Sequence, residues 1–395
     1  MKKILIKILV SIIIIVSGFA IFSFGFHYGY EQIPESPKGL PSDVDITLLW
    51  DIWNKIEQKY VKDSDYQAMI YGAAKGLAES LGDPYTIFLE PEDSKIFMDD
   101  VSGAFQGVGM EISIKDGELT VVSPLEGTPA QGAGVLPGDK IIKIEDTYTR
   151  DITVEDAVKM IRGEKGTKIK LAIYREGWES TKDFEIIRDV IEIPSTKLEI
   201  IDGNIAKATI YQFSGNLSFE FTKIVDIIVH NNSIEKIILD LRSNPGGLLS
   251  EAQNMAGWFL ERGDVVTVER FGRDKKDREY LAAGNELLKK YPLVVLINKG
   301  SASGAEILAA ALRDNKNNVK LIGEKSFGKG SVQEPIRLRD GSLLKITVAN
   351  WLTPNGDLIH QVGLEPDIKI EMTEDDYKEG NDPQLEKAIE ILKEM

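Results

Sequence analysis

A strand-like segment that runs directly into a helix constrains the fold of this chain more than any other feature. The apolar run 293–297 is followed by the turn N-K-G-S-A-S-G and then by residues rich in alanine and leucine. Ser303 is therefore expected at a strand-to-helix corner, where the first backbone N–H groups of the helix are free to bind an anion. A serine nucleophile in acyl transfer needs such donors, because an oxyanion forms beside it. The simpler interpretation, favoured by this stretch alone, is that Ser301 and Ser303 cap the helix.

The same alternation of short apolar strands and helical patterns extends over residues 190–370. The expected strands are 205–211 and 236–241, and the expected helices are 217–229 and 248–260. This alternation is typical of an α/β domain. The second strand leads into the loop R-S-N-P-G-G, in which Gly246 and Gly247 would let backbone N–H groups approach a ligand closely. Residues 371–395 are acidic and end in an expected helix, 384–395.

Composition narrows the chemistry that this chain can perform. A length of 395 residues suggests about two or three domains, and a net charge of −16 argues against a general nucleic-acid binder. Cysteine is absent, which excludes disulfides, a thiolate nucleophile and cysteine-ligated metal. The three histidines show no metal-ligand spacing, and a Ser-His-Asp triad would have to use His230 or His360. We therefore expect no metal and no cofactor, and a hydrolase of this composition would use a lysine or carboxylate base.

The N-terminus carries a predicted membrane anchor, residues 1–30. Three lysines precede a run, residues 8–26, that is uncharged and long enough to span a hydrocarbon core of about 30 Å. Lysines on the N-terminal side place that end in the cytoplasm, so the rest of this single-pass protein is expected on the extracytoplasmic side of the cell membrane. A cleaved signal peptide is the alternative. The run is longer than a typical signal h-region, and no small-x-small cleavage site follows it.

The next two segments are a linker and a helical region. Residues 31–42 contain three prolines and read as a linker. Residues 43–100 show apolar positions at three- and four-residue spacing, among them Leu48, Leu49 and Ile52. They are predicted to form a small helical domain that buries an apolar stripe. A helical arm at this place could also pair with the same arm of a second copy.

Residues 101–183 combine short strand patterns with glycine-rich turns. Strand patterns at 110–114 and 119–122 are followed by a helical stretch at 154–161 and a strand at 168–174. The turn G-V-L-P-G-D-K-I resembles that of the permuted bacterial PDZ domains. The run Gly107-Val108-Gly109-Met110 matches the loop with which such domains bind a C-terminal carboxylate, where glycine lets backbone N–H groups converge. The alternative is that these glycines belong to an ordinary hairpin.

Lys329, in the sequence F-G-K-G, is the candidate general base. A neutral amine near pH 7 requires its pKa to fall by about three pH units, or about 4 kcal/mol, which burial can supply. Gln333 could orient the amine through its side-chain amide. The segment also fits G-x-x-x-x-G-K, but Gly330 stands where a P-loop needs serine or threonine, and residues 331–338 look extended. A nucleotide site is therefore disfavoured.

Three motifs together resemble those of the carboxy-terminal processing proteases, also called tail-specific proteases. They are L-R-S-N-P-G-G, S-A-S-G-A-E-I and F-G-K-G-S-V-Q, and the ending T-P-N-G-D…G-L-E-P-D-I matches as well. The resemblance implies a ClpP/crotonase-like α/β core at 190–370, within a multidomain chain that also has the N-terminal helix, the helical segment, the PDZ domain and the C-terminal helical tail. It implies that Ser303 is the nucleophile, Lys329 the base and Gln333 the residue that positions the lysine. The implied oxyanion-hole residues are Gly304, Gly246 and Gly247. The family often has serine where this chain has Ala305, which is not the nucleophile position.

The resemblance implies a serine endopeptidase with a Ser-Lys dyad that cleaves extracytoplasmic proteins or peptides. Its PDZ domain would recognise substrates with apolar C-termini. The expected partners are such substrates, the membrane, a second copy of the chain and an activating or adaptor protein. The alternative function is a non-catalytic, peptide-binding PDZ adaptor on a protease-like core.

Overall fold

The computed structural model describes residues 43–395, except 116, 126, 151, 273–274 and 317. The predicted membrane anchor and linker lie outside the described residues. Across the described part of the chain, no helix combines the length and the apolar character that a membrane crossing requires. The chain divides into two compact units, of which the first ends at Ile70 and the second begins at Tyr71.

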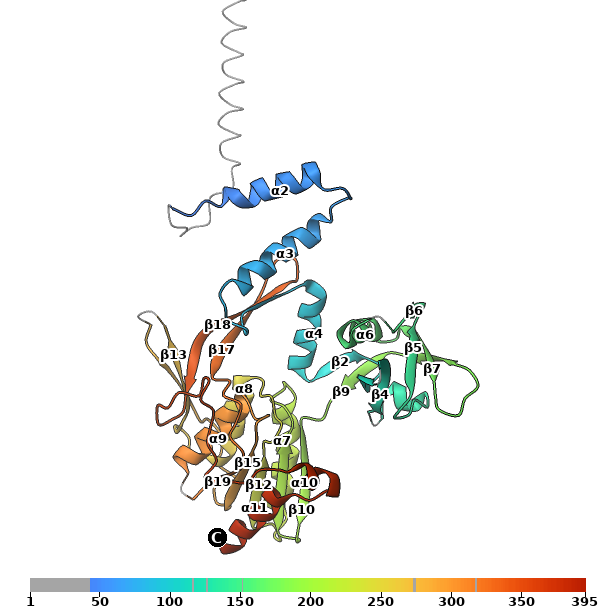
Figure 1. Ribbon diagram of the computed structural model, residues 1–395. Coiled ribbons are helices and arrows are strands. Elements are labelled where there is room, and N and C mark those ends of the chain that lie inside the picture. The colour runs from blue at the N-terminus through green and yellow to red at the C-terminus, as the bar shows by residue number, and fades with distance from the viewer. Residues whose placement is uncertain (1–42, 116, 126, 151, 273–274, 317) are drawn as a thin grey trace, which may run out of the picture. The chain divides into compact units, whose positions relative to one another are not determined.

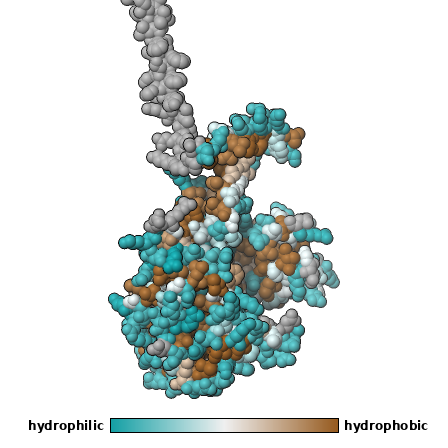
Figure 2. Space-filling model, turned by 60° about the vertical axis from the view of Figure 1, so that its left-hand side comes forward, coloured by the Kyte–Doolittle hydropathy of each residue, from teal (hydrophilic) through white to brown (hydrophobic). Residues whose placement is uncertain are grey.

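The first unit contains helix α2 (Thr47–Lys59) and the start of helix α3 (Tyr66–Glu79). The rings of Trp53 and Tyr66 stack with centroids 5.6 Å apart. The helices confirm the predicted pattern, but the prediction that their apolar stripe is buried within the chain is wrong. Leu48 and Leu49 are 61% and 57% exposed, and no residue of α2 is buried. Figure 2 shows brown apolar residues on the surface of this arm. Periodicity shows that a helix has an apolar face, but not what covers that face.

The second unit contains a six-stranded sheet that carries the candidate site. Its strand order is β10 (Thr196–Ile201), β11 (Ile205–Ile210), β12 (Lys236–Asp240), β15 (Leu293–Ile297), β16 (Lys320–Gly323) and β19 (Ile368–Lys369). All neighbouring pairs are parallel except β10 with β11. This confirms the predicted α/β alternation (Figure 1). Strand β15 begins and ends where the sequence predicts.

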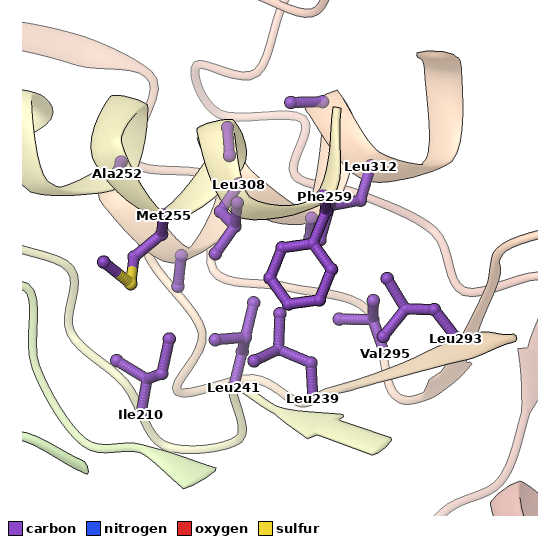
Figure 3. Close-up of a cluster of buried hydrophobic side chains, with 14 of the residues drawn as sticks. Ile210, Leu239, Leu241, Ala252, Met255, Phe259, Leu293, Val295, Leu308 and Leu312 are labelled. Atoms are coloured by element: carbon purple, nitrogen blue, oxygen red, sulfur yellow. The ribbon is translucent and has the colours of Figure 1, made fainter. Parts of the chain in front are cut away.

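Both faces of this sheet are covered, which explains why β15 is a continuous apolar run. Leu293 and Val295 point into a cluster with helices α7 (Leu217–His230), α8 (Leu249–Phe259) and α9 (Gly304–Asn315). Figure 3 shows Met255 and Phe259 of α8 pointing at strand residues in this cluster. Val294 and Leu296 point the other way, into a cluster with helix α11 (Pro383–Glu394). The alternation follows from the two-residue period of a strand.

A second sheet shows that the predicted helical segment 43–100 also contains a short strand. Its strands are β1 (Ile87–Leu89), β13 (Val265–Phe271), β14 (Arg278–Leu281), β17 (Ser331–Arg337) and β18 (Leu343–Leu352). The three residues of β1 pair with β18 in antiparallel register. They lie between α3 and helix α4 (Pro91–Ser102), and pairing to a distant strand overrides the local helical pattern.

The PDZ region forms a separate sheet with helices α5 (Pro129–Gly132) and α6 (Val154–Ile161). Its strands are β3 (Met110–Lys115), β4 (Glu118–Pro124), β5 (Lys140–Ile144), β6 (Thr147–Tyr148), β7 (Lys168–Tyr174) and β8 (Lys182–Ile187). The predicted helix 154–161 and strand 168–174 are confirmed to the residue. Strands β2 (Ala104–Gly107) and β9 (Asp189–Glu192) pair with each other before and after this sheet. Helix α10 (Glu374–Glu379) precedes α11 in the tail.

Candidate active site

Ser303 lies at the corner between β15 and α9, as the sequence predicts. Its backbone has φ 54° and ψ −115°, a conformation that is strained for a residue with a side chain. Neighbouring contacts hold the corner in place. The fully buried Ser301 hydroxyl donates to the Leu241 carbonyl at 2.8 Å, and the Ala302 N–H donates to the Asn244 carbonyl at 2.9 Å. Ser301 therefore supports the turn, and Ser303 is the serine at its tip.

Glu306, in the first turn of α9, joins the two halves of the candidate site. Its side chain is fully buried. Oxygen Oε2 accepts the backbone N–H groups of Ser303 and Lys329, each at 2.9 Å. Oxygen Oε1 accepts the Ser326 hydroxyl at 2.5 Å and the Gly328 N–H at 2.7 Å. One carboxylate thus fixes the backbone of the candidate nucleophile to that of the candidate base.

The charge state of Glu306 follows from its partners. Burial raises the pKa of this carboxyl, and its four hydrogen bonds, headed by that from Ser326, oppose the rise. All four partners are donors, so the ionised carboxylate satisfies them and a protonated acid would leave one N–H or O–H without an acceptor. Sequence reasoning missed this residue. The only local signal is the spacing Ser-x-x-Glu, which reads as an ordinary capping box.

The surroundings of Lys329 shift the pKa of its amine in the direction that a general base requires. Burial lowers the pKa of its amine, while the charge of Glu306 acts in the opposite direction. The amine lies 5.5 Å from the centre of the Tyr85 ring. A lowered pKa increases the neutral fraction, which is the form that can accept a proton.

Gln333, the predicted partner of Lys329, makes different contacts here. Its amide donates to the Ser331 carbonyl at 3.0 Å and to the Ser331 hydroxyl at 2.7 Å. Its role in orienting the lysine amine stays a prediction.

The glycine loop that follows β12 lies directly against Ser303. The Gly246 N–H donates to the side-chain oxygen of buried Asn244 at 2.8 Å, so it is not free for an oxyanion. The Gly304 N–H is the first of helix α9 and has no acceptor within the helix. A Cβ atom built on Gly304 would lie 3.6 Å from the Gly247 nitrogen. The Gly246 N–H is therefore already bonded within the loop, and the roles of Gly247 and Gly304 as oxyanion donors stay predictions.

Alanine at Gly246 is expected to reduce kcat/KM for peptide cleavage by at least about 100-fold, the loss typical of a damaged oxyanion hole. Gly246 has φ +93°, and its added Cβ would lie 2.6 Å from Ser303 Cβ and 2.8 Å from Gly304 N. The matched control is Gly263→Ala, at φ +101° with no atom within 4 Å of its Cβ. Steady-state kinetics and thermal unfolding of both variants separate the two effects. Equal losses of activity in both would show that backbone strain, and not collision with Ser303, is responsible.

The other side of this loop is tied to the C-terminal tail. The Arg242 guanidinium binds both oxygens of Asp240, at 2.9 and 2.8 Å, and both oxygens of Asp382, each at 2.8 Å. Burial alone would lower the pKa of Arg242, but these two carboxylates raise it above its usual value. Asp382 also caps α11 by accepting the Leu385 N–H. The predicted tail helix therefore helps to hold the loop beside Ser303.

The predicted carboxylate-binding loop of the PDZ region borders a small apolar cavity. Val108, Gly109 and Met110 line this cavity of about 70 Å³, whereas Gly107 does not. The other lining residues come from β2, β3, α6 and the residue that follows α6: Phe105, Ile112, Val158, Ile161 and Arg162. Gly109 has φ +77° and packs so closely on Thr128 that a Cβ would lie 2.5 Å from it.

Among the described residues, no group of three acidic or histidine side chains is arranged to hold a metal ion.

Comparisons with known proteins agree with this architecture. The model of peptidase family S41 matches residues 204–370, and the PDZ domain model matches residues 99–174. The chain is 40% identical to the carboxy-terminal processing protease CtpA of Bacillus subtilis, over 81% of this chain and 68% of that protein. It is 37% identical to a probable CtpA-like serine protease of Staphylococcus epidermidis, of which it spans 64%.

Solved structures show the same relationship. The photosystem II D1 C-terminal processing protease superposes with a TM-score of 0.50 at 27% identity, over 83% of this chain and 89% of that one. A putative S41 protease from Bacteroides fragilis has the same fold, with a TM-score of 0.51 at 17% identity, over 90% of this chain and 99% of that one. The sequence resemblance to the carboxy-terminal processing proteases is thereby confirmed. The chain belongs to peptidase family S41 and is a serine-type, carboxy-terminal processing peptidase with a PDZ domain.

Proposed function

We propose that this peptidase works through a Ser303–Lys329 dyad. The observation that carries the proposal is the shared carboxylate oxygen of Glu306, which accepts the backbone N–H groups of both residues. The strained corner presents the Ser303 hydroxyl, and burial favours the neutral form of the Lys329 amine. Each partner thus has the property that its role demands.

The reaction follows from these roles. The Lys329 amine takes the proton of the Ser303 hydroxyl while the serine oxygen bonds to the peptide carbonyl carbon. The negative charge that develops on the carbonyl oxygen is stabilised by the N–H groups of Gly304 and Gly247. The resulting ammonium protonates the leaving amine as the C–N bond breaks, and an acyl-enzyme remains. Water then attacks the ester with Lys329 again as base and releases the new C-terminus.

We propose that the PDZ domain selects substrates with apolar C-termini and either delivers them to the core or controls access to it. Its cavity is lined mainly by apolar side chains and lies beside the predicted carboxylate-binding loop. Such a site suits an apolar terminal residue that is added along a strand edge.

We further propose that the enzyme is anchored in the cell membrane and acts on its extracytoplasmic side. The uncharged run that follows the N-terminal lysines supports this placement. The exposed apolar residues of α2 support a homodimer through the helical arm, because a second copy could cover them. Regulation by an activating or adaptor protein is part of the same proposal.

A cleavage assay on the full chain in detergent tests the proposed function. Wild type and Ser303→Ala are each incubated with an unfolded protein that ends in apolar residues, and with the same protein ending in aspartates. Intact mass spectrometry follows the products. We expect wild type alone to cleave, and to prefer the apolar terminus. Binding without cleavage by wild type would instead favour the peptide-binding adaptor.

A further inference from the structure

The segment between α3 and β1 brings a tyrosine to the candidate base. Tyr85 lies in the region 43–100 that was predicted to be helical, and its ring centre is 5.5 Å from the Lys329 amine. We infer that Tyr85 is a positioning residue for the proposed reaction: its ring shields the Lys329 amine from water, so that the amine can accept the proton of Ser303. This inference rests on the proposed dyad and adds a residue that the dyad needs.

Hydrogen bonds fix the Tyr85 backbone on both sides. The Tyr85 N–H donates to Asp83 Oδ1 at 3.0 Å, and the buried Thr86 hydroxyl donates to Asp83 Oδ2 at 2.6 Å. The same hydroxyl accepts the Thr347 N–H of β18 at 3.0 Å. Strand β1 then pairs with β18, starting with Ile87 opposite Lys345. The tyrosine is therefore held against the second sheet. Strand β17 belongs to the same sheet, and the loop that contains Lys329 leads into β17.

The ring itself packs between two parts of the site. Lys329 lies over it, and the His360 ring meets it at 69° with centroids 6.4 Å apart. The backbone of His360 can approach because Gly330 has no side chain. A Cβ atom on Gly330 would lie 2.1 Å from the backbone nitrogen of His360. Glycine next to Lys329 therefore has a packing reason, which is to let the 359–360 backbone approach and support the Tyr85 ring.

The charged groups around Lys329 make water exclusion important. The charge of Glu306 in α9 favours the protonated form of the Lys329 amine. The Glu306 carboxylate, however, already accepts four hydrogen bonds from other groups. Lys345 of β18 is half-buried and repels a second positive charge at Lys329. Asp83 and His360 are the remaining titratable groups on the segments packed beside the Tyr85 ring. No carboxylate of the described residues forms an ion pair with this amine, so any water that reaches it would add to the effect of Glu306 in stabilising its charged form.

The ring has two opposing effects on that charged form. Its face attracts a cation, which raises the pKa of Lys329, and its bulk excludes water, which lowers it. The cation–ring attraction is weak here, because 5.5 Å is close to the limit of about 6 Å at which it acts. Exclusion of water is therefore expected to dominate, and the apolar bulk of residue 85 should matter more than its aromatic face.

Three substitutions separate these effects in the full chain. The pH dependence of kcat/KM is measured with a fluorogenic peptide that ends in apolar residues, for wild type, Tyr85→Phe, Tyr85→Leu and Tyr85→Ala. Activity rises with pH as Lys329 loses its proton. We expect the midpoint to be unchanged in Tyr85→Phe, unchanged or lower in Tyr85→Leu, and higher by about one pH unit in Tyr85→Ala. On the acidic side Tyr85→Ala then loses about tenfold in kcat/KM and recovers at high pH.

The control is Tyr148→Ala, which removes a ring 4.1 Å from the amine of Lys143 in the PDZ domain and should not move the midpoint. A wild-type midpoint in Tyr85→Ala, with activity lowered equally at every pH, would reduce Tyr85 to a structural role. A lower midpoint in both Tyr85→Leu and Tyr85→Ala would show that cation–ring attraction dominates, which also overturns the inference. Failure of the dyad itself looks different, because Lys329→Ala would then retain activity.

Discussion

Alanine at Ser303 or at Lys329 is expected to reduce kcat/KM for peptide cleavage by about 10⁴-fold or more. Each residue performs a step that the other cannot, so removing one removes the acyl-enzyme route altogether. Losses within such a unit are not additive, and the double variant is expected to be no worse than either single one. Steady-state kinetics on the apolar-ended peptide measure all three. Additive losses would contradict a dyad that acts as one unit.

Substitution of Lys329 by methionine tests whether this loss is chemical. Burial lowers the pKa of Lys329 in the folded protein. At pH values between the lowered pKa of Lys329 in the folded protein and its ordinary pKa in the unfolded chain, the unfolded state binds more protons. The free energy of unfolding therefore rises with pH in this window. Lys329→Met removes both the cost of burying the amine and this pH dependence. We expect an inactive variant that is at least as stable as wild type at pH 7, measured by denaturant unfolding. A large loss of stability would mean that the amine is structural.

The isosteric change Glu306→Gln is expected to cost about 3–5 kcal/mol of unfolding free energy, together with at least about 100-fold in kcat/KM. The carboxylate accepts four hydrogen bonds, two on each oxygen. A glutamine places an NH₂ group where one oxygen stood, so either Ser303 and Lys329 or Ser326 and Gly328 would face a donor. Loss of a buried acceptor of this kind carries the full desolvation cost of its partners.

A buried glutamate elsewhere in the core provides the control for this variant. Glu251 accepts the N–H and the hydroxyl of Ser218, at 3.0 and 2.5 Å, and is 8% exposed. Glu251→Gln should also destabilise the protein, measured by urea unfolding, but leave kcat/KM near the wild-type value. If Glu306→Gln kept wild-type kcat/KM under conditions where it is folded, Glu306 would not be needed to align the site.

The corner that carries Ser303 could be predicted from sequence because its signals are local. An apolar strand, a glycine-serine turn and an alanine-rich helix follow one another, and the structure confirms them at Leu293–Ile297 and Gly304–Asn315. Glu306 could not be singled out in the same way. Its local role as a capping residue is visible in the sequence, but its bonds to Gly328 and Lys329 depend on the packing of two segments that are distant in sequence.

Tyr85 and the apolar stripe of α2 show the same limit. No local pattern connects Tyr85 with Lys329, because the contact arises from pairing of β1 with β18. The spacing of Leu48 and Leu49 correctly predicts a helix, but a stripe of this kind can face a core, a second copy or solvent. The use of the Gly246 N–H within the loop, in contrast, could have been predicted from local sequence. Asn244, two residues earlier, is a residue type whose side chain accepts a hydrogen bond from the backbone N–H two residues on. That signal was present in N-P-G-G.

The most direct test of the dyad is to locate the nucleophile chemically. The full chain is treated with a serine-reactive fluorophosphonate, and the adduct is counted by intact mass and located by peptide fragmentation. We expect one adduct, on Ser303, whose formation stops cleavage and which does not form in Lys329→Ala. An adduct on another serine that abolishes cleavage, or undiminished cleavage after Ser303 is fully modified, would contradict it.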